Sequence, residues 1–331
     1  MRKLILLIVV AALIYGGYWF IGRSQIQDRL TEALIQADDG AYEVTYNTLK
    51  TRGFPSRFDT TVTDFHFADP ATGTEWTAPL FQLLALSYRP NEVIAIFPPE
   101  QTFTVNGTEI TLQTNDMRAS GKVRANAALS FQDATVTMDA PRFITDDGGQ
   151  LAMANILAAT RLTPDTAQTY DIFVEAHAIE LPENIRRFID PGNLQPPLVQ
   201  ALRFDSDATL SAPLELLSPD GDAPTFESLS IKEFAATWGE ISLTAIGDIE
   251  PNEYGVPSGS VSVSARNWQQ GLDLAVANGM VDANRRFLVT EIANNLDETP
   301  HIPDTLTLTL TITNGVMSLG GLPLGSVPSL R

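Results

Sequence analysis

An uninterrupted apolar run near the N-terminus constrains this chain more than any other feature. Residues 4–21 read LILLIVVAALIYGGYWFI and contain no charged residue. A helix of about 20 apolar residues crosses the roughly 30 Å hydrocarbon core of a bilayer. Arg2 and Lys3 precede the run, and basic residues favour the cytoplasmic side of a membrane. The sequence therefore predicts a transmembrane signal anchor over residues 1–23, with the rest of the chain on the far side.

A cleaved signal peptide is the alternative, because it begins with the same charge and the same kind of apolar run. A cleavage site needs small residues, whereas this run ends with Tyr15, Tyr18, Trp19 and Phe20. Aromatic residues of this kind are typical of a membrane interface. We expect an uncleaved anchor, and both interpretations deliver the bulk of the chain to the same compartment.

Charge and cysteine content exclude several classes of function. The formal net charge of -19 argues against nucleic-acid binding, which needs a basic surface. The absence of cysteine excludes disulfides, thiol catalysis, iron–sulfur clusters and cysteine zinc sites. An exported chain without cysteine and with a short basic start is typical of the bacterial periplasm. We expect a single-pass protein of the bacterial inner membrane with its bulk in the periplasm.

Beyond the anchor, the sequence predicts a mainly β (α+β) fold of curved antiparallel sheets with a few short helices. The clearest strand covers residues 305–313, where leucine and isoleucine alternate with threonine. Residues 102–105, 109–114, 121–130 and 133–139 read as a meander, and residues 237–249 read as one long strand. One face of each strand is then apolar and the other polar.

We expect two related halves after a short stalk. A helical apolar pattern predicts the stalk over residues 24–40, followed by a first β-rich half over residues 41–190. The tract from Pro191 to Pro197 predicts a hinge, so the second half covers residues 191–331. Helices are expected near residues 267–298, where Asn267 and Asp282 are candidate N-caps.

Three segments carry a resemblance to a known family. They are GFPSRF at residues 53–58, WTAPLFQ at residues 76–82 and SYRPNEVIAIFPPEQ at residues 87–101. Together they resemble an uncharacterised alphaproteobacterial family of membrane-anchored periplasmic proteins, domain-of-unknown-function family 2125. A weaker architectural resemblance connects residues 238–265 and the ending NGVMSLGGLPLG with AsmA-like and TamB-like envelope proteins. That second resemblance implies a sheet whose apolar face holds lipid chains.

Signatures of catalysis and metal binding are weak. His66, His177 and His301 are isolated, and the sequence has no nucleophile elbow, S-x-x-K motif or Walker loop. Asp64 with His66 supplies at best the start of a metal site. The acidic pairs Asp205 with Asp207 and Asp220 with Asp222 are explained more simply by turn chemistry or loose calcium binding. We expect no enzyme activity, no cofactor and no metal.

The candidate ligand-binding residues combine arginines with aromatic side chains. Arginines at the mouth of an apolar groove would suit a phospholipid head group. The alternative is that the aromatic residues form core and that each arginine pairs with a nearby acid. The candidates are Arg52, Phe54, Arg57, Trp76, Phe81, Tyr88, Arg89 and Phe97.

The expected function is a non-enzymatic, membrane-anchored periplasmic protein that binds lipid or another apolar ligand along a curved sheet. Envelope maintenance or lipid handling would be its context. Its expected partners are the inner membrane, phospholipid and other envelope proteins, without nucleic acid. The alternative is an envelope scaffold that holds a membrane complex and has no ligand cavity.

Overall fold

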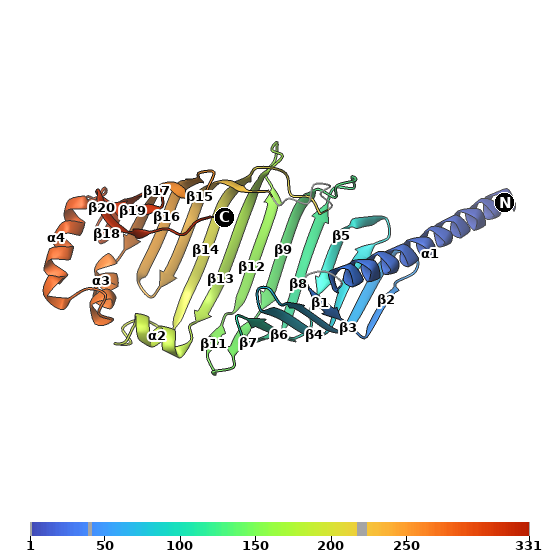
Figure 1. The fold of residues 1–331 in the computed structure, drawn as a ribbon, viewed down its shortest axis with the longest axis horizontal. Coiled ribbons are helices and arrows are strands. Elements are labelled where there is room, and N and C mark those ends of the chain that lie inside the picture. Colours follow the sequence, from blue (N-terminus) through green and yellow to red (C-terminus); the bar gives the residue numbers. More distant parts are fainter. Residues whose placement is uncertain (1, 39–41, 217–223, 331) are drawn as a thin grey trace. The chain divides into compact units, whose positions relative to one another are not determined.

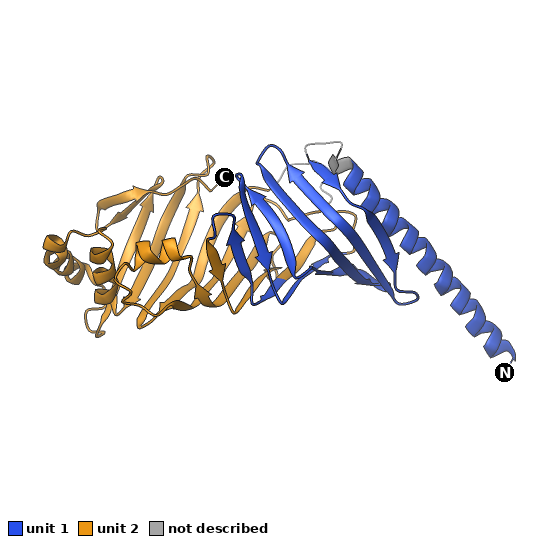
Figure 2. Ribbon diagram, turned by 90° about the horizontal axis from the view of Figure 1, so that it is seen from below, with its two compact units in different colours: residues 1–124, 136–148 blue, residues 125–135, 149–331 orange. Residues whose placement is uncertain are grey.

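The computed structural model describes residues 2–38, 42–216 and 224–330. It is mainly β, with a large antiparallel sheet, short helices and one long N-terminal helix (Figure 1), as the sequence predicts. The chain forms two compact units (Figure 2). Unit 1 comprises residues 1–124 and 136–148, and unit 2 comprises residues 125–135 and 149–331.

Helix α1 (Arg2–Asp38) begins unit 1 and is continuous, so the expected stalk is an extension of the expected anchor. By length and composition α1 can cross a membrane, a test that a signal sequence also passes. The strands of this unit are β1 (Glu43–Thr45), β2 (Thr48–Arg52), β3 (Arg57–Asp69), β4 (Thr74–Leu86), β5 (Arg89–Ile96), β6 (Glu100–Val105), β7 (Thr108–Gln113), β8 (Asp116–Val123) and β10 (Arg142–Thr145). Strand β9 (Phe131–Asp139) contributes residues to both units.

The core of unit 1 lies over β1, β3 and β4. Val44, Val62 and Phe65 are buried together, and Trp76 and Phe81 pack against them. Strict alternation would put Val62 and Phe65 on opposite faces, but Asp64, with a φ of 50°, is skipped in the β3–β4 register, and this irregularity brings both side chains to one face.

Unit 2 is a meander in which β12 to β20 each pair with the next strand along the chain. Its strands are β11 (Gln150–Ala152), β12 (Asn155–Leu162), β13 (Thr169–Glu180), β14 (Leu198–Leu210), β15 (Phe226–Trp238), β16 (Ile241–Pro251), β17 (Pro257–Arg266), β18 (Thr305–Thr313), β19 (Val316–Leu319) and β20 (Leu322–Ser326). Its helices are α2 (Glu183–Ile189), α3 (Trp268–Ala277), the 3-10 helix η1 (Ala283–Arg285) and α4 (Arg286–Leu296).

Several local predictions differ from the structure. The expected strand at 237–249 is two strands, because Gly239 has a φ of 63° and turns the chain between β15 and β16. The expected strand at 121–130 starts earlier and ends at Val123. Asn267 stands at the N-cap of α3, but its side chain donates to the Glu240 carbonyl instead of bonding to the helix. Asp282 caps the short helix η1 rather than α4, whose N-cap residue is Arg285. The tract at 191–197 lies inside unit 2, between α2 and β14.

Candidate functional site

Three of the predicted ligand-binding residues lie in an aromatic cluster of unit 1. The ring centroid of Trp76 is 5.5 Å from that of Phe81 and 6.0 Å from that of Phe97. Trp76 also donates a hydrogen bond from Nε1 to Oε1 of the buried Gln101, over 3.0 Å. All three rings are half-buried. Their geometry is that of side chains packed on the core of unit 1.

The other five predicted residues lie at one end of the unit 1 sheet, around two turns. Residues 53–56 connect β2 to β3, and residues 87–88 connect β4 to β5; we call these the tip loops. Two of the three arginines next to the loops have acidic partners: Arg57 contacts Asp59 at 3.0 Å and Arg89 contacts Glu92 at 3.8 Å. The predicted residues at this end are Arg52, Phe54, Arg57, Tyr88 and Arg89, all exposed.

Both tip loops contact α1: Ser87 accepts a hydrogen bond from Tyr18, and Phe54 packs against Trp19 (Figure 1 shows this helix beside β2). The Trp19 indole donates to the Arg57 carbonyl at 2.8 Å, and its ring stacks on Phe58 with centroids 5.9 Å apart. Trp19 is only 3% exposed. The aromatic end of the apolar run is therefore part of the packing of unit 1.

The unit 2 sheet carries mainly apolar side chains on one face and mainly polar side chains on the other. One face carries the row Val174, Phe204, Phe234, Ala245, Val263 and Leu308, each the register partner of the next. The adjacent row on the same face is Ile172, Ser206, Ile231, Gly247, Val261 and Leu310. We call this surface the apolar face.

Much of the apolar face keeps contact with solvent. Val174, Phe204 and Phe234 are half-buried in the structure, and so are Ile231 and Val261. Within the described residues, the cluster of fully buried apolar side chains lies in unit 1 rather than here. A sheet face of this composition normally packs against a second layer. The large side chains of the apolar face are therefore only partly covered in the structure, whereas Ser206 and Ala245 between them are buried.

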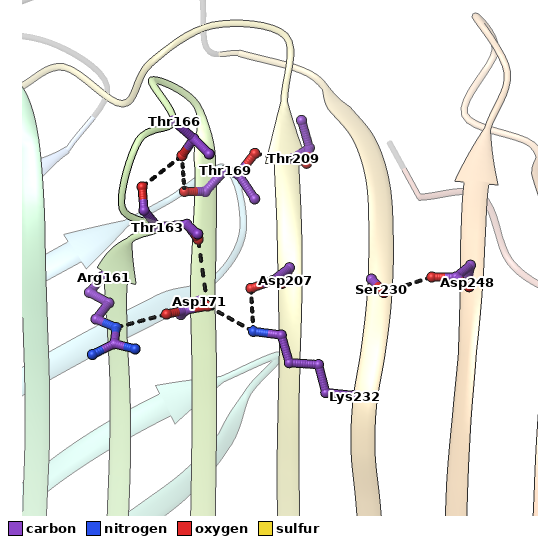
Figure 3. Close-up of polar contacts among 10 residues, drawn as sticks. All are labelled: Arg161, Thr163, Thr166, Thr169, Asp171, Asp207, Thr209, Ser230, Lys232 and Asp248. Carbon is purple, nitrogen blue, oxygen red and sulfur yellow. Dashed lines mark hydrogen bonds and ion pairs between the residues drawn. The ribbon is translucent and has the colours of Figure 1, made fainter.

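The opposite face of the same strands is polar. Its corresponding row is Asp171, Asp207, Ser230, Asp248, Ser260 and Thr311. The Ser230 hydroxyl donates to Asp248 at 2.6 Å (Figure 3). Side chains alternate between faces along a strand, so one sequence pattern produces both surfaces.

Four charged residues on this polar face form a network across β12 to β15 (Figure 3). Arg161 donates from Nε to Asp171 at 2.7 Å, and Lys232 Nζ contacts Asp171 at 2.8 Å and Asp207 at 2.6 Å. We call Arg161, Asp171, Asp207 and Lys232 the polar network. Lys232 directly follows Ile231 of the apolar face, so ordinary alternation places it on this face, next to a register shift between Ile231 and Phe234.

The two carboxyl groups of the polar network titrate in opposite directions. A hydrogen bond with Asp207, with a second one from Lys232, lowers the pKa of Asp171. Burial raises the pKa of Asp207, and the hydrogen bond with Asp171 adds to that rise. Burial alone would lower the pKa of Lys232, but its hydrogen bonds to both carboxylates raise it. The network is thus an ion-pair cluster in which one carboxylate holds its charge more firmly.

A cleft of about 370 Å³ borders the polar network and is lined by Asp133, Arg161, Asp171, Phe173, Asp205 and Lys232, among others. Asp205 lines this cleft and Asp207 belongs to the network, so the pair singled out in the sequence lies here. Nowhere in the described ranges do three or more ligating side chains gather as a metal site would require. His66 bonds to Thr77 at 3.1 Å, and the pair Asp220 and Asp222 lies outside the described residues.

The sequence profile of a bacterial family described as "uncharacterized protein conserved in bacteria" (DUF2125) matches residues 19–328. The chain belongs to this family. The match begins at Trp19, the residue that packs α1 onto the tip loops, and it runs through both units. No curated protein matches the chain.

The apolar face is the feature that sequence reasoning did not locate. The sequence shows clear alternation at 305–313, but in β13 to β17 the pattern is interrupted by Phe173 and Ile246 on the polar face, by Ser206 on the apolar face and by the register shift in β15. The paired register of these strands is therefore needed to assemble both faces. The combination of arginines with aromatic residues directs the site prediction instead to positions 52–97, of which Trp76 and Phe81 pack on the core of unit 1.

Proposed function

We propose that this DUF2125 protein is a non-enzymatic, membrane-anchored periplasmic protein that holds lipid acyl chains along the apolar face of unit 2. The observation that carries the proposal is the continuous apolar face over β13 to β18, whose large side chains stay partly in contact with solvent. In this proposal α1 is the uncleaved anchor in the inner membrane, and the sheet of unit 2 is curved around its ligand.

The dimensions and energetics of the apolar face suit an acyl chain. Strands lie about 4.8 Å apart, so the five steps from β13 to β18 extend about 24 Å across the strands. One leaflet of a bilayer contributes about 15 Å of hydrocarbon thickness, so an extended acyl chain fits within that length. Each methylene group removed from water contributes about 0.8 kcal/mol, which favours a long chain over a small apolar metabolite.

The competing proposal is a scaffold whose apolar face is covered by another envelope protein. A lipid acyl chain and a partner protein would bury the same side chains, so the burial of these side chains does not distinguish the two proposals. Charge favours lipid weakly, because the face itself carries uncharged side chains in its two central rows. Specific protein interfaces usually surround their apolar centre with satisfied polar groups.

Site-specific photocrosslinking in living bacteria separates the two occupants. Benzoylphenylalanine replaces Phe204 or Phe234 on the apolar face, with Ile246 on the opposite face as the matched control. Ile246 is 56% exposed, so the control probe reaches solvent freely. After irradiation of cells grown with radioactive phosphate, we expect labelled phospholipid adducts at 204 and 234 and none at 246.

The outcomes are distinct. Discrete protein adducts at 204 and 234 without phospholipid would replace the lipid proposal with the scaffold. Equal phospholipid labelling at 246 would show contact with the membrane at large rather than a specific face. The absence of any adduct at 204 and 234 would overturn both occupants.

A further inference from the structure

The tip loops of unit 1 contact α1 inside its apolar run rather than beyond it. The Tyr15 hydroxyl lies 2.8 Å from Ser87 Oγ, and the Tyr18 hydroxyl donates to the Ser87 carbonyl at 2.6 Å. Phe54 packs edge-on against Trp19, with ring centroids 5.3 Å apart. The apolar run of α1 continues past these contacts to Ile21.

The length of α1 fixes what these contacts imply in a membrane. At 1.5 Å per residue, the run from Leu4 to Ile21 extends about 27 Å, close to the hydrocarbon thickness of a bilayer. Tyr15 lies about 9 Å before Ile21 along the helix axis. If the membrane ended at Tyr15, only about 16 Å of apolar helix would remain, which is half of what a span needs. The tip loops therefore cannot clear the bilayer while α1 spans it.

Side-chain direction strengthens this constraint. Side chains on a helix lean toward its N-terminus, which here points into the membrane. The hydroxyl groups of Tyr15 and Tyr18 therefore lie at least as deep in the bilayer as their own Cα atoms. Ser87 is hydrogen-bonded to both tyrosines, through its hydroxyl and its carbonyl, and is fully buried. The β4–β5 turn thus reaches the level of Tyr15 to Tyr18.

The tip loops have the composition of a membrane interface. Phe54 is 56% exposed and Tyr88 is 63% exposed, and aromatic side chains of this kind favour the headgroup region. Arg52 and Arg89 border the loops, and guanidinium groups bind phosphate well. The opposite end of the same hairpin, the turn between β3 and β4, is flanked instead by acidic residues such as Asp69 and Glu75.

We infer that the tip loops, residues 53–56 and 87–88, insert into the periplasmic-side interface of the phospholipid bilayer beside α1. Phe54 and Tyr88 lie among the upper acyl chains, and the neighbouring arginines lie among the phosphates. Unit 1 is then held to the membrane by α1 and by both tip loops, rather than by α1 alone. This inference rests on α1 spanning the membrane, which belongs to the proposed function, but not on a ligand at the apolar face.

The absence of cysteine allows a direct test with single-cysteine variants of the full chain. Tyr88→Cys and Phe54→Cys report on the tip loops, and Ala71→Cys is the matched control at the opposite end of β3 and β4. Leu13→Cys reports on α1 itself. Each variant carries an environment-sensitive fluorophore in liposomes of phosphatidylethanolamine and phosphatidylglycerol, and is quenched either by lipids with a nitroxide on the upper acyl chain or by aqueous iodide.

We expect the lipid quencher to act several-fold more strongly at 88 and 54 than at 71, and iodide to show the reverse order. Tyr88→Cys keeps the aromatic packing of Trp19, so it remains informative if Phe54→Cys loosens the helix. Lipid quenching at 13 together with iodide quenching at 54 and 88 would overturn the inference and leave the anchor intact. Iodide quenching at 13 would overturn the anchor and the inference together.

Discussion

Replacing Lys232 with methionine tests whether the polar network stabilises unit 2 electrostatically. The Nζ of Lys232 lies 2.8 Å from Asp171 and 2.6 Å from Asp207, on adjacent strands. Methionine keeps the length of the side chain and removes the charge. Two carboxylates then face each other with only Arg161 as a cation beside them.

The expected loss follows from the exposure of these groups. The Lys232 side chain is 42% exposed, so each of its ion pairs contributes about 0.2–1 kcal/mol after solvent screening. Loss of both pairs, together with the new repulsion between carboxylates, is expected to cost about 1–2 kcal/mol near neutral pH.

The pH dependence has a definite sign. The pKa of Asp171 is lowered in the fold, so its contribution is present above the unfolded value of about 3.9 and is lost as pH falls through the folded value. Asp207 has a raised pKa and contributes in the opposite direction over that range. Protonation of both removes the partners of Lys232. The difference between the wild-type chain and Lys232→Met should therefore shrink in acid.

The assay is urea denaturation of the full chain in detergent, near neutral pH and in acid. A brief hydrogen-exchange pulse at one fixed pH reads the unfolded fraction of peptides from β13 to β15, so unit 2 is observed by itself. Lys122→Met is the matched control, because Lys122 pairs with Glu92 in unit 1 and has similar exposure. An equal loss at both pH values would refute the electrostatic reasoning and assign the effect to packing.

Three further predictions concern single contacts. The buried hydroxyl groups of Thr51 and Thr60 lie 2.8 Å apart. Thr51→Val leaves the Thr60 hydroxyl without this partner and should lower the free energy of unfolding by about 1–3 kcal/mol. The double variant Thr51→Val with Thr60→Val should recover most of that loss, as a double-mutant cycle measured by denaturation would show. Gly22→Leu should separate α1 from the strands of unit 1, because even a Cβ atom at position 22 would lie 2.9 Å from the Phe58 ring. The protease sensitivity of α1 would measure this separation, and unchanged protection of the helix would contradict the prediction. Backbone N–H groups bonded to Asp297 lower its pKa. Asp297→Asn should therefore destabilise the chain near neutral pH, and the loss should shrink as pH falls below the unfolded value of about 3.9 and through the folded value, as pH-dependent melting would reveal.

Local features of the fold could be predicted from the sequence because their causes are local. The apolar run of α1, the alternation of β18 and the turn at Asn314 and Gly315 each depend on neighbouring residues. The contacts that define the candidate sites are not local. Tyr15 and Ser87 are 72 residues apart, and nothing in either segment specifies the other.

The polar network shows the same limit more sharply. Asp171 and Lys232 are 61 residues apart and meet only because β13, β14 and β15 pair side by side. Strict alternation from Ile231 would place Lys232 on the polar face, as observed, but Glu233 on the apolar face. The register shift instead keeps Glu233 on the polar face, paired with Asp205. A bulge of one residue cannot be read from composition, and it decides which charges share a face.

The meander of unit 2 makes the length of its sheet adjustable. Among its described strands from β12 to β20, each pairs antiparallel with the next strand along the chain, although α2 lies between β13 and β14, and α3, η1 and α4 lie between β17 and β18. Duplication or deletion of one hairpin would change the sheet by about 10 Å and leave every remaining pairing in register. In a chain built on this plan, tandem duplication of hairpins would lengthen the sheet across its strands, so the number of hairpins would set that length.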